Sequence, residues 1–243
     1  MSTTSRMPGS WSSSDTEDWN DAVFEEEVLS TSSTLALDKS QPPTPDGTGL
    51  PVNFHLIGPG LFRSSYPLMN HFSILESYGF KTIITLVPGD ILEENRVFFK
   101  NHGINHHQIH VVANKVSDVY PSAETISSII KIMMNRANHP VLIHCNKGKH
   151  RTGCVAAIFR RCTGWPLEAC IEEYEKYAAL KARDLDKAFI SRFDVKELKA
   201  LALQEGFVTG AFAPPHNLAD SSNASAYTNN TFVSYETSST MNA

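Results

Sequence analysis

Short apolar runs alternate with longer amphipathic stretches along the middle of this chain, and this alternation narrowly limits its possible folds. Residues 81–87 and 140–144 are rich in β-branched and aliphatic side chains, which is typical of buried strands. Residues 122–137 instead place Ile126, Ile129 and Ile130 on one helical face, after Ser122 as a capping residue. Strands separated by helices predict an α/β fold with a central, mostly parallel sheet flanked by helices on both faces.

The same patterns place the remaining elements. Further strands are expected at residues 52–57, 61–64 and 104–112, and further helices at 70–78, 90–102, 151–161, 166–180 and 187–203. Ligands of such sheets bind beyond the carboxyl ends of the strands. Residues 145–151 follow the strand at 140–144 and therefore occupy that position.

Both ends of the chain differ in composition from its middle. Residues 50–206 carry 19 Lys and Arg against 15 Asp and Glu, whereas the ends carry 2 against 11. We predict a folded domain at 50–206, a disordered acidic Ser/Thr-rich tail at 1–49, and a disordered tail at 207–243. Trp19 and Phe24 lie among acidic residues, so the first tail is either solvated or a docking segment for a protein partner.

Charge and cysteine content exclude several classes of function. No basic stripe interleaved with aromatic residues indicates nucleic-acid binding, and no apolar run is long enough to span a membrane. The N-terminus lacks an apolar signal segment, and all four cysteines lie between residues 145 and 170, which is a poor disulfide framework. We therefore expect a cytoplasmic protein with reduced thiols.

The segment from His144 to Gly153, HCNKGKHRTG, carries the chemistry. A buried strand delivers Cys145 to the sheet edge, and five residues arch over before a helix begins near Arg151. Backbone N–H groups in such an arch form an anion nest, to which the helix N-terminus adds partial positive charge. Gly148 permits the tight backbone, and the Arg151 guanidinium can hold two phosphate oxygens at once.

This arrangement predicts a cysteine nucleophile. The thiolate is the reactive form of cysteine, and a cationic setting at a helix N-terminus favours it. Cys145 would attack phosphorus, and water would cleave the phosphocysteine, with the amides and Arg151 neutralising the transition-state charge. We expect no metal or cofactor to be needed. The Thr152 hydroxyl is expected to reach the Cys145 sulfur, and His144 is expected to brace the loop.

The pattern His-Cys-x5-Arg-Thr-Gly resembles the signature of the protein tyrosine phosphatase superfamily. The fuller string is similar to that of the plant-and-fungal atypical dual-specificity phosphatases, which act on inositol pyrophosphates. Residues 61–67 (LFRSSYP) and the later pattern Tyr174…Ala178-x-x-Lys181-x-Arg183-x-x-Asp186 also resemble that family. The resemblance covers about residues 51–200 and implies a fold of the dual-specificity phosphatase type.

The resemblance also implies a substrate: the β-phosphate of a diphosphoinositol polyphosphate, or another phosphorylated molecule. Arg63 is interpreted as structural. Two roles stay open for Arg183, contact with the anion or support of the loop from behind. The residues expected to bind substrate are Asn146, Lys147, Gly148, Lys149, His150, Lys115 and Arg183.

The general acid is the least defined group. The family usually places an Asp on the loop corresponding to residues 113–121, and here that loop offers Asp118 alone. A family Ile-Pro-Asp tripeptide is replaced by Tyr120-Pro121-Ser122. Asp118 is the candidate acid. A phosphate leaving group needs less protonation than an alkoxide. This difference from the family pattern therefore fits a pyrophosphate substrate, and it equally fits a weakened enzyme.

Three rival functions remain open. The domain is alternatively a protein tyrosine or dual-specificity phosphatase acting on peptides, a non-catalytic inositol polyphosphate-binding module, or a sulfur-transfer enzyme of the rhodanese type. Intact Cys145 and Arg151 favour catalysis over binding alone, and Lys149, His150 and Thr152 favour phosphate over sulfur transfer.

Overall fold

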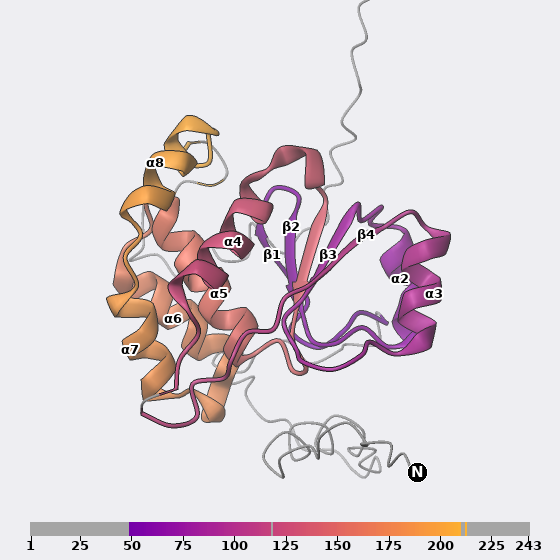
Figure 1. Cartoon of the computed structure of the whole chain (residues 1–243), viewed down its shortest axis with the longest axis horizontal. Helices are drawn as coiled ribbons and strands as arrows, with labels where there is room; N and C mark the ends of the chain where they lie inside the picture. Colours follow the sequence, from indigo (N-terminus) through magenta and orange to yellow (C-terminus); the bar gives the residue numbers. More distant parts are fainter. Residues whose placement is uncertain (1–48, 118, 210–211, 213–243) are drawn as a thin grey trace, which may run out of the picture.

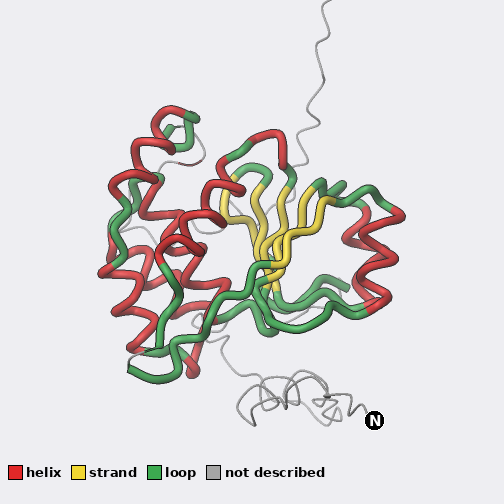
Figure 2. The backbone as a smooth tube through the Cα atoms, viewed as in Figure 1, coloured by secondary structure: helices red, strands yellow, loops and turns green. Residues whose placement is uncertain are grey.

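A five-stranded mixed sheet forms the centre of the domain (Figures 1 and 2). The computed structural model describes residues 49–117, 119–209 and 212, so most of both predicted tails, and Asp118, lie outside the described residues. The strands are β1 (His55–Gly58), β2 (Leu61–Ser64), β3 (Thr82–Thr85), β4 (Asn105–Gln108) and β5 (Val141–His144), in the order β1-β2-β5-β3-β4. The pair β1–β2 is antiparallel and the other three pairs are parallel, which confirms a mostly parallel sheet.

Helices cover both faces of this sheet, as predicted (Figure 1). On one side lie α2 (Phe72–Glu76), which follows the 3-10 turn η1 (Met69–His71), and α3 (Glu93–Asn101). On the other side lie α4 (Ala123–Met134), the turn η2 (Arg136–Asn138), α5 (His150–Cys162), α6 (Leu167–Ala178), the turn η3 (Ala179–Lys181), α7 (Asp184–Arg192) and α8 (Lys196–Gln204).

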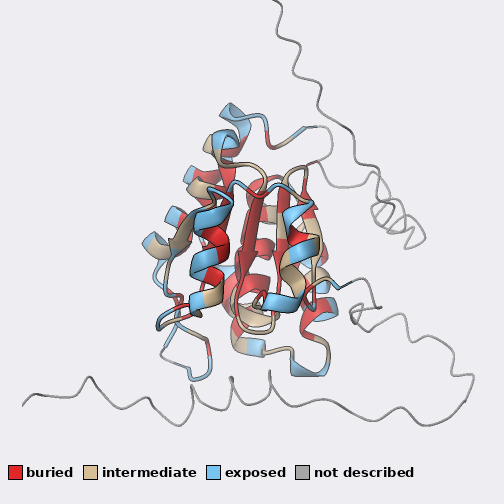
Figure 3. Cartoon of the chain, turned by 90° about the vertical axis from the view of Figure 1, so that its right-hand side faces the viewer, coloured by how far each residue is buried: buried red, intermediate tan, exposed pale blue. Residues whose placement is uncertain are grey.

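The sheet separates two apolar cores, and the strands at its centre are buried (Figure 3). Successive side chains of a strand point to opposite faces, so neighbours serve different cores. In β3, Ile83 packs into the core under α2 and α3, whereas Ile84 packs into the larger core under the other helices. In β5, Leu142 and Ile143 divide in the same way.

Several predicted boundaries were wrong by a few residues. The predicted helix at 187–203 is two helices, because the backbone leaves the helical conformation at Phe193, with a ψ of 127°, and the Asp194 side chain accepts the Lys196 backbone N–H. The predicted helix at 166–180 ends at Ala178, after which Ala179 has a φ of 51°. The Ser122 cap is confirmed, since its hydroxyl accepts the Thr125 N–H at 3.1 Å.

The folded part also extends past residue 206. Phe207 and Phe212 are buried in the larger core, although the second tail was predicted to begin at residue 207. Trp165 Nε1 donates to the Phe212 carbonyl at 3.0 Å. Within the described ranges, no helix combines the length and apolar character that a membrane span requires.

Candidate active site

Strand β5 delivers Cys145 to the carboxyl edge of the parallel part of the sheet. It lies between β2 and β3 and ends at His144, which is paired in register with Ser64 and Thr85. The loops that follow β2, β3 and β5 therefore gather at one end of the sheet (Figure 2). Cys145 is buried there as a free thiol.

Residues 145–149 form a tight loop that leads directly into α5. Gly148 has a φ of 66°, and a Cβ at this position would lie 2.6 Å from the carbonyl carbon and oxygen of Ser64. Any side chain here would be strained and would also collide with backbone. Glycine is therefore required both for the loop's conformation and for its contact with the end of β2.

Three consecutive carbonyls of this loop are bound from outside. Asn53 Nδ2 donates to the Lys147 carbonyl at 2.8 Å, and the Tyr66 N–H donates to the Asn146 carbonyl at 3.0 Å. Arg63 Nη2 donates to the Gly148 carbonyl at 2.8 Å. In a trans peptide the N–H points opposite to the preceding carbonyl, so the next three amides are directed toward the inside of the loop. Such amides form an anion nest.

Arg63 supports this loop from behind. Its fully buried guanidinium stacks 3.9 Å from the centre of the Tyr177 ring, and Nη1 lies 3.7 Å from Glu173 Oε1. Burial lowers the pKa of Arg63, and Tyr177 and Glu173 oppose that shift. The sequence had left this supporting role open for Arg183, which instead faces the ligand side of the loop.

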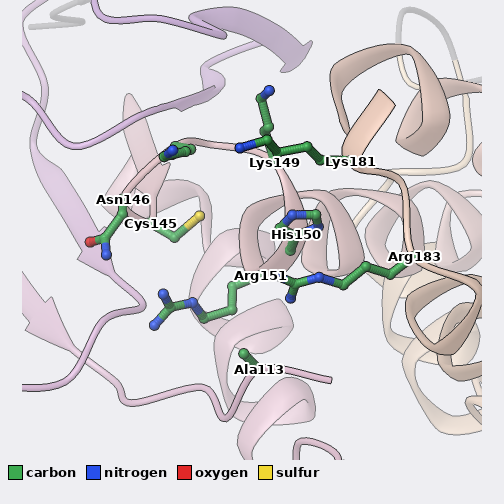
Figure 4. A pocket seen from close by; sticks show the side chains of 9 residues that line it. Ala113, Cys145, Asn146, Lys149, His150, Arg151, Lys181 and Arg183 are labelled. Carbon is green, nitrogen blue, oxygen red and sulfur yellow. The ribbon is translucent and has the colours of Figure 1, made fainter. Parts of the chain in front are cut away.

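A hollow of about 560 Å³, including space open to solvent, lies over the loop (Figure 4). The Cys145 sulfur is turned toward the inside of the loop, and the Lys181 and Arg183 side chains reach in from the opposite side. The hollow is lined by Ala113, Cys145, Asn146, Lys147, Lys149, His150, Arg151, Lys181 and Arg183. Five of these nine residues are Lys or Arg, which makes the hollow suited to an anion.

The structure thus brings together most of the residues predicted to form the site. Gly148 shapes the loop, whereas Lys115 is exposed and is not among the residues lining the hollow, so its binding role stays a prediction. Asp118 lies outside the described residues. Lys181 was missed, although its spacing from Arg183 in the Lys-x-Arg pattern could have indicated it.

His144 braces the site as expected. Its Nε2 lies 2.8 Å from Thr85 Oγ1, which also contacts His106 Nε2 at 2.9 Å, and its ring packs edge-on against Tyr66. Burial, and to a lesser extent His106, lower the pKa of His144 to about 3. The imidazole is therefore neutral at physiological pH and serves as a support.

The expected Thr152 contact is not made. Its hydroxyl is buried and has no hydrogen-bond partner among the residues that the structure describes, the Cys145 sulfur included. The side chain follows Arg151 in the first turn of α5, where helical backbone geometry fixes its position.

A buried polar cluster joins the loop to α6 and α7. Asp186 Oδ2 accepts the Tyr174 hydroxyl at 2.7 Å and lies 3.3 Å from His150 Nδ1. Its other oxygen accepts Asn114 Nδ2 at 2.8 Å. The Tyr174 hydroxyl also accepts the Arg183 N–H at 3.0 Å, which fixes the segment that carries Lys181 and Arg183.

A thiol on an inward-facing amide loop, with an arginine six residues later on the following helix, defines a cysteine-based phosphatase of the Cys-x5-Arg class. Comparisons with known proteins agree. Residues 50–209 match the model of the "Tyrosine phosphatase family". The chain belongs to this family.

Several curated relatives are inositol diphosphatases from plants and yeast. Inositol diphosphatase DSP4 of Arabidopsis thaliana is 40% identical over 149 residues, which cover 61% of this chain and 75% of the relative. Inositol diphosphatase SIW14 of Saccharomyces cerevisiae is 38% identical over 160 residues, 65% of this chain and 57% of the relative. The crystal structure of the SIW14 core catalytic domain with citrate, described as a PP-IP phosphatase, superimposes with a TM-score of 0.60 at 35% identity, covering 65% of this chain and 96% of that one.

Proposed function

We propose that this enzyme removes the β-phosphate of a diphosphoinositol polyphosphate through a phosphocysteine intermediate. The observation that carries the proposal is the number of cationic side chains around one thiol. Lys147, Lys149 and Arg151 border the hollow from the loop, and Lys181 and Arg183 border it from the opposite side. A single phosphate is already satisfied by the amide loop and one arginine. The additional charges suit a ligand with several phosphates, and the names of the curated relatives support the same class.

The reaction would proceed in two displacements. The Cys145 thiolate attacks the β-phosphorus, an S–P bond forms, and the bond from the β-phosphorus to the bridging oxygen breaks. The inositol polyphosphate leaves with that oxygen. Water then attacks the phosphocysteine, which releases inorganic phosphate and restores the thiolate. Inward-facing amides and Arg151 would stabilise the charge in both transition states.

A substrate panel tests the proposal. We expect kcat/KM for diphosphoinositol polyphosphates to exceed that for phosphotyrosine and phosphoserine peptides by at least about 10-fold, because a peptide offers no further phosphate to Lys181 and Arg183. Cys145→Ser should abolish turnover and permit capture of the bound ligand. A preference for phosphopeptides would instead support the protein phosphatase alternative, and turnover by Cys145→Ser would contradict the covalent route.

Asp118 remains a proposed proton donor, and Lys115 a proposed substrate contact. We also propose a cytoplasmic location, for which the four free cysteines are the support, because such thiols persist in reducing compartments. A protein partner for the acidic segment around Trp19 and Phe24 is proposed from the sequence alone, since this segment lies outside the described residues.

A further inference from the structure

The residues that line the hollow include no carboxylic acid within the described part of the chain. This is unexpected, because a leaving oxygen is commonly protonated by a positioned acid. Apart from the Cys145 nucleophile, the lining side chain that ordinarily exchanges a proton near neutral pH is His150. His150 is the first residue of α5, directly before Arg151, and its ring borders the same hollow as the thiol (Figure 4).

The His150 ring is oriented by a buried carboxylate. Nδ1 lies 3.3 Å from Asp186 Oδ2 and 3.4 Å from the Tyr174 hydroxyl. Because Tyr174 donates to one carboxylate oxygen and Asn114 to the other, Asp186 is held in place independently of His150. A carboxylate at Nδ1 selects the tautomer that carries a proton there and stabilises the imidazolium. The remaining nitrogen, Nε2, is then the atom that can exchange a proton with a ligand.

Asp186 is ionised under physiological conditions. Burial alone would raise its pKa, but hydrogen bonds from His150, Tyr174 and Asn114 hold the pKa below its usual value. The carboxylate therefore carries its charge beside His150 throughout the neutral range.

We propose that His150, positioned by Asp186, transfers the protons of the reaction. This inference rests on the phosphocysteine route of the proposed function. In the first step, Nε2–H of the imidazolium protonates the leaving oxygen as the P–O bond breaks and the S–P bond forms. In the second step, the neutral Nε2 takes a proton from water as its oxygen bonds to phosphorus and the S–P bond breaks. The imidazolium is thereby restored.

Charged and titratable groups from several elements contact this histidine or line the same hollows. They are Asp186 from α7, Tyr174 from α6, Lys181 and Arg183 from the segment between these helices, Cys145, Lys147 and Lys149 from the loop, and Arg151 and Cys154 from α5. Among these groups, Asp186 is the carboxylate that lies at Nδ1, so its substitution tests the positioning of His150.

Two aryl phosphates of different leaving-group basicity test the proposal and do not depend on which inositol species is the substrate. His150→Gln should lower kcat/KM for phenyl phosphate, which reports the steps up to departure of the leaving group, by about 100-fold, because a basic phenolate needs a proton. The same variant should lower kcat/KM for 4-nitrophenyl phosphate by less than about 10-fold, since that anion leaves readily. The alkaline limb of the wild-type kcat profile should also disappear.

Asp186→Asn tests the positioning role. Removal of the negative charge should move the alkaline limb to lower pH, a result that a merely structural role does not produce. His102→Gln is the matched control: His102 also pairs with a carboxylate, Glu76, at 3.3 Å, but it lies at the end of α3 and does not line the hollow. It should leave both the kinetic ratio and the pH profile unchanged.

Equal losses of kcat/KM on the two aryl phosphates would overturn the proposal and leave His150 as an anion contact. A steeper dependence on leaving group in Asp118→Asn but not in His150→Gln would assign the acid to Asp118. Thermal melting of each variant separates misfolding from a chemical effect. If His150→Gln is unstable, the pH profile of Asp186→Asn still tests the proposal. If the enzyme does not hydrolyse diphosphoinositol polyphosphates but shows the expected difference between the two aryl phosphates, only the proposed substrate is refuted, and the role of His150 stands.

Discussion

At the scale of single residues, Gly148 illustrates how little freedom the phosphate loop has. Gly148→Ala would combine a left-handed backbone with a Cβ 2.6 Å from the Ser64 backbone. We expect a loss of more than about 2 kcal/mol in the free energy of unfolding, and a decrease of at least about 10-fold in kcat/KM, because the loop must shift. Urea unfolding and steady-state kinetics measure both quantities.

Gly79 provides the control for this prediction. It has a similar φ of 60°, but a Cβ there meets nothing within 4 Å. Gly79→Ala should therefore cost only the backbone strain of about 1 kcal/mol and leave kinetics unchanged. Equal effects of the two substitutions would show that the contact with Ser64 is unimportant.

At the scale of secondary-structure elements, Arg63 joins β2, the phosphate loop and α6. Arg63→Lys keeps the charge but loses the planar stacking on Tyr177 and the geometry of the bond to Gly148. We expect stability to fall by about 2 kcal/mol and kcat to fall with it, because a loop carbonyl loses its partner. Arg96→Lys is the control: the exposed Arg96–Glu93 pair should change stability by at most about 0.5 kcal/mol. A loss of stability without any loss of kcat would remove Arg63 from the support of the loop.

The elements themselves were largely predictable, because hydrophobic periodicity is local. The strands around Ile84 and Ile143 and the Ser122 cap follow from neighbouring residues alone. The spatial order of the strands in the sheet does not follow from neighbouring residues. Nothing within residues 52–64 indicates that β1 lies at the edge of the sheet, and the Lys-x-Arg spacing does not by itself place the Lys181 side chain across from Cys145. The loop was predictable because its chemistry is contained in ten consecutive residues, whereas the opposite wall depends on tertiary contacts such as Tyr174 with Asp186.

At the scale of the whole molecule, the end of the domain lies further along the chain than composition suggested. Phe207 is fully buried, and Phe212 packs so closely on β1 that a Cβ at Gly58 would lie 2.6 Å from its ring. The Arg136 guanidinium stacks 4.3 Å from the centre of the Phe207 ring. These residues close the larger core. None of them lines the hollow, so their role is stability.

Truncation tests this boundary. A chain that ends after residue 206 should be less stable than one that ends after residue 212 by at least about 3 kcal/mol, the usual cost of removing a buried phenylalanine side chain. Both should keep the same kcat per folded molecule at low temperature, since neither residue lines the hollow. Equal melting temperatures for the two chains would show that the folded domain ends at residue 206.

The stability of the whole molecule should also depend on buried neutral histidines. Burial is the largest cause that lowers the pKa of His55 to about 4 and of His144 to about 3. In the unfolded chain a histidine titrates near 6.5, so below that pH the unfolded state binds protons that the native state does not. The free energy of unfolding should therefore fall as pH decreases from about 6.5 toward 4, by up to about 1.4 kcal/mol per pH unit for each histidine. Urea unfolding at pH 7, 6 and 5 measures this slope. His55→Gln and His144→Asn should each reduce it, because each removes one group that is protonated only on unfolding; a slope unchanged in both variants would show that these imidazoles are protonated inside the native protein.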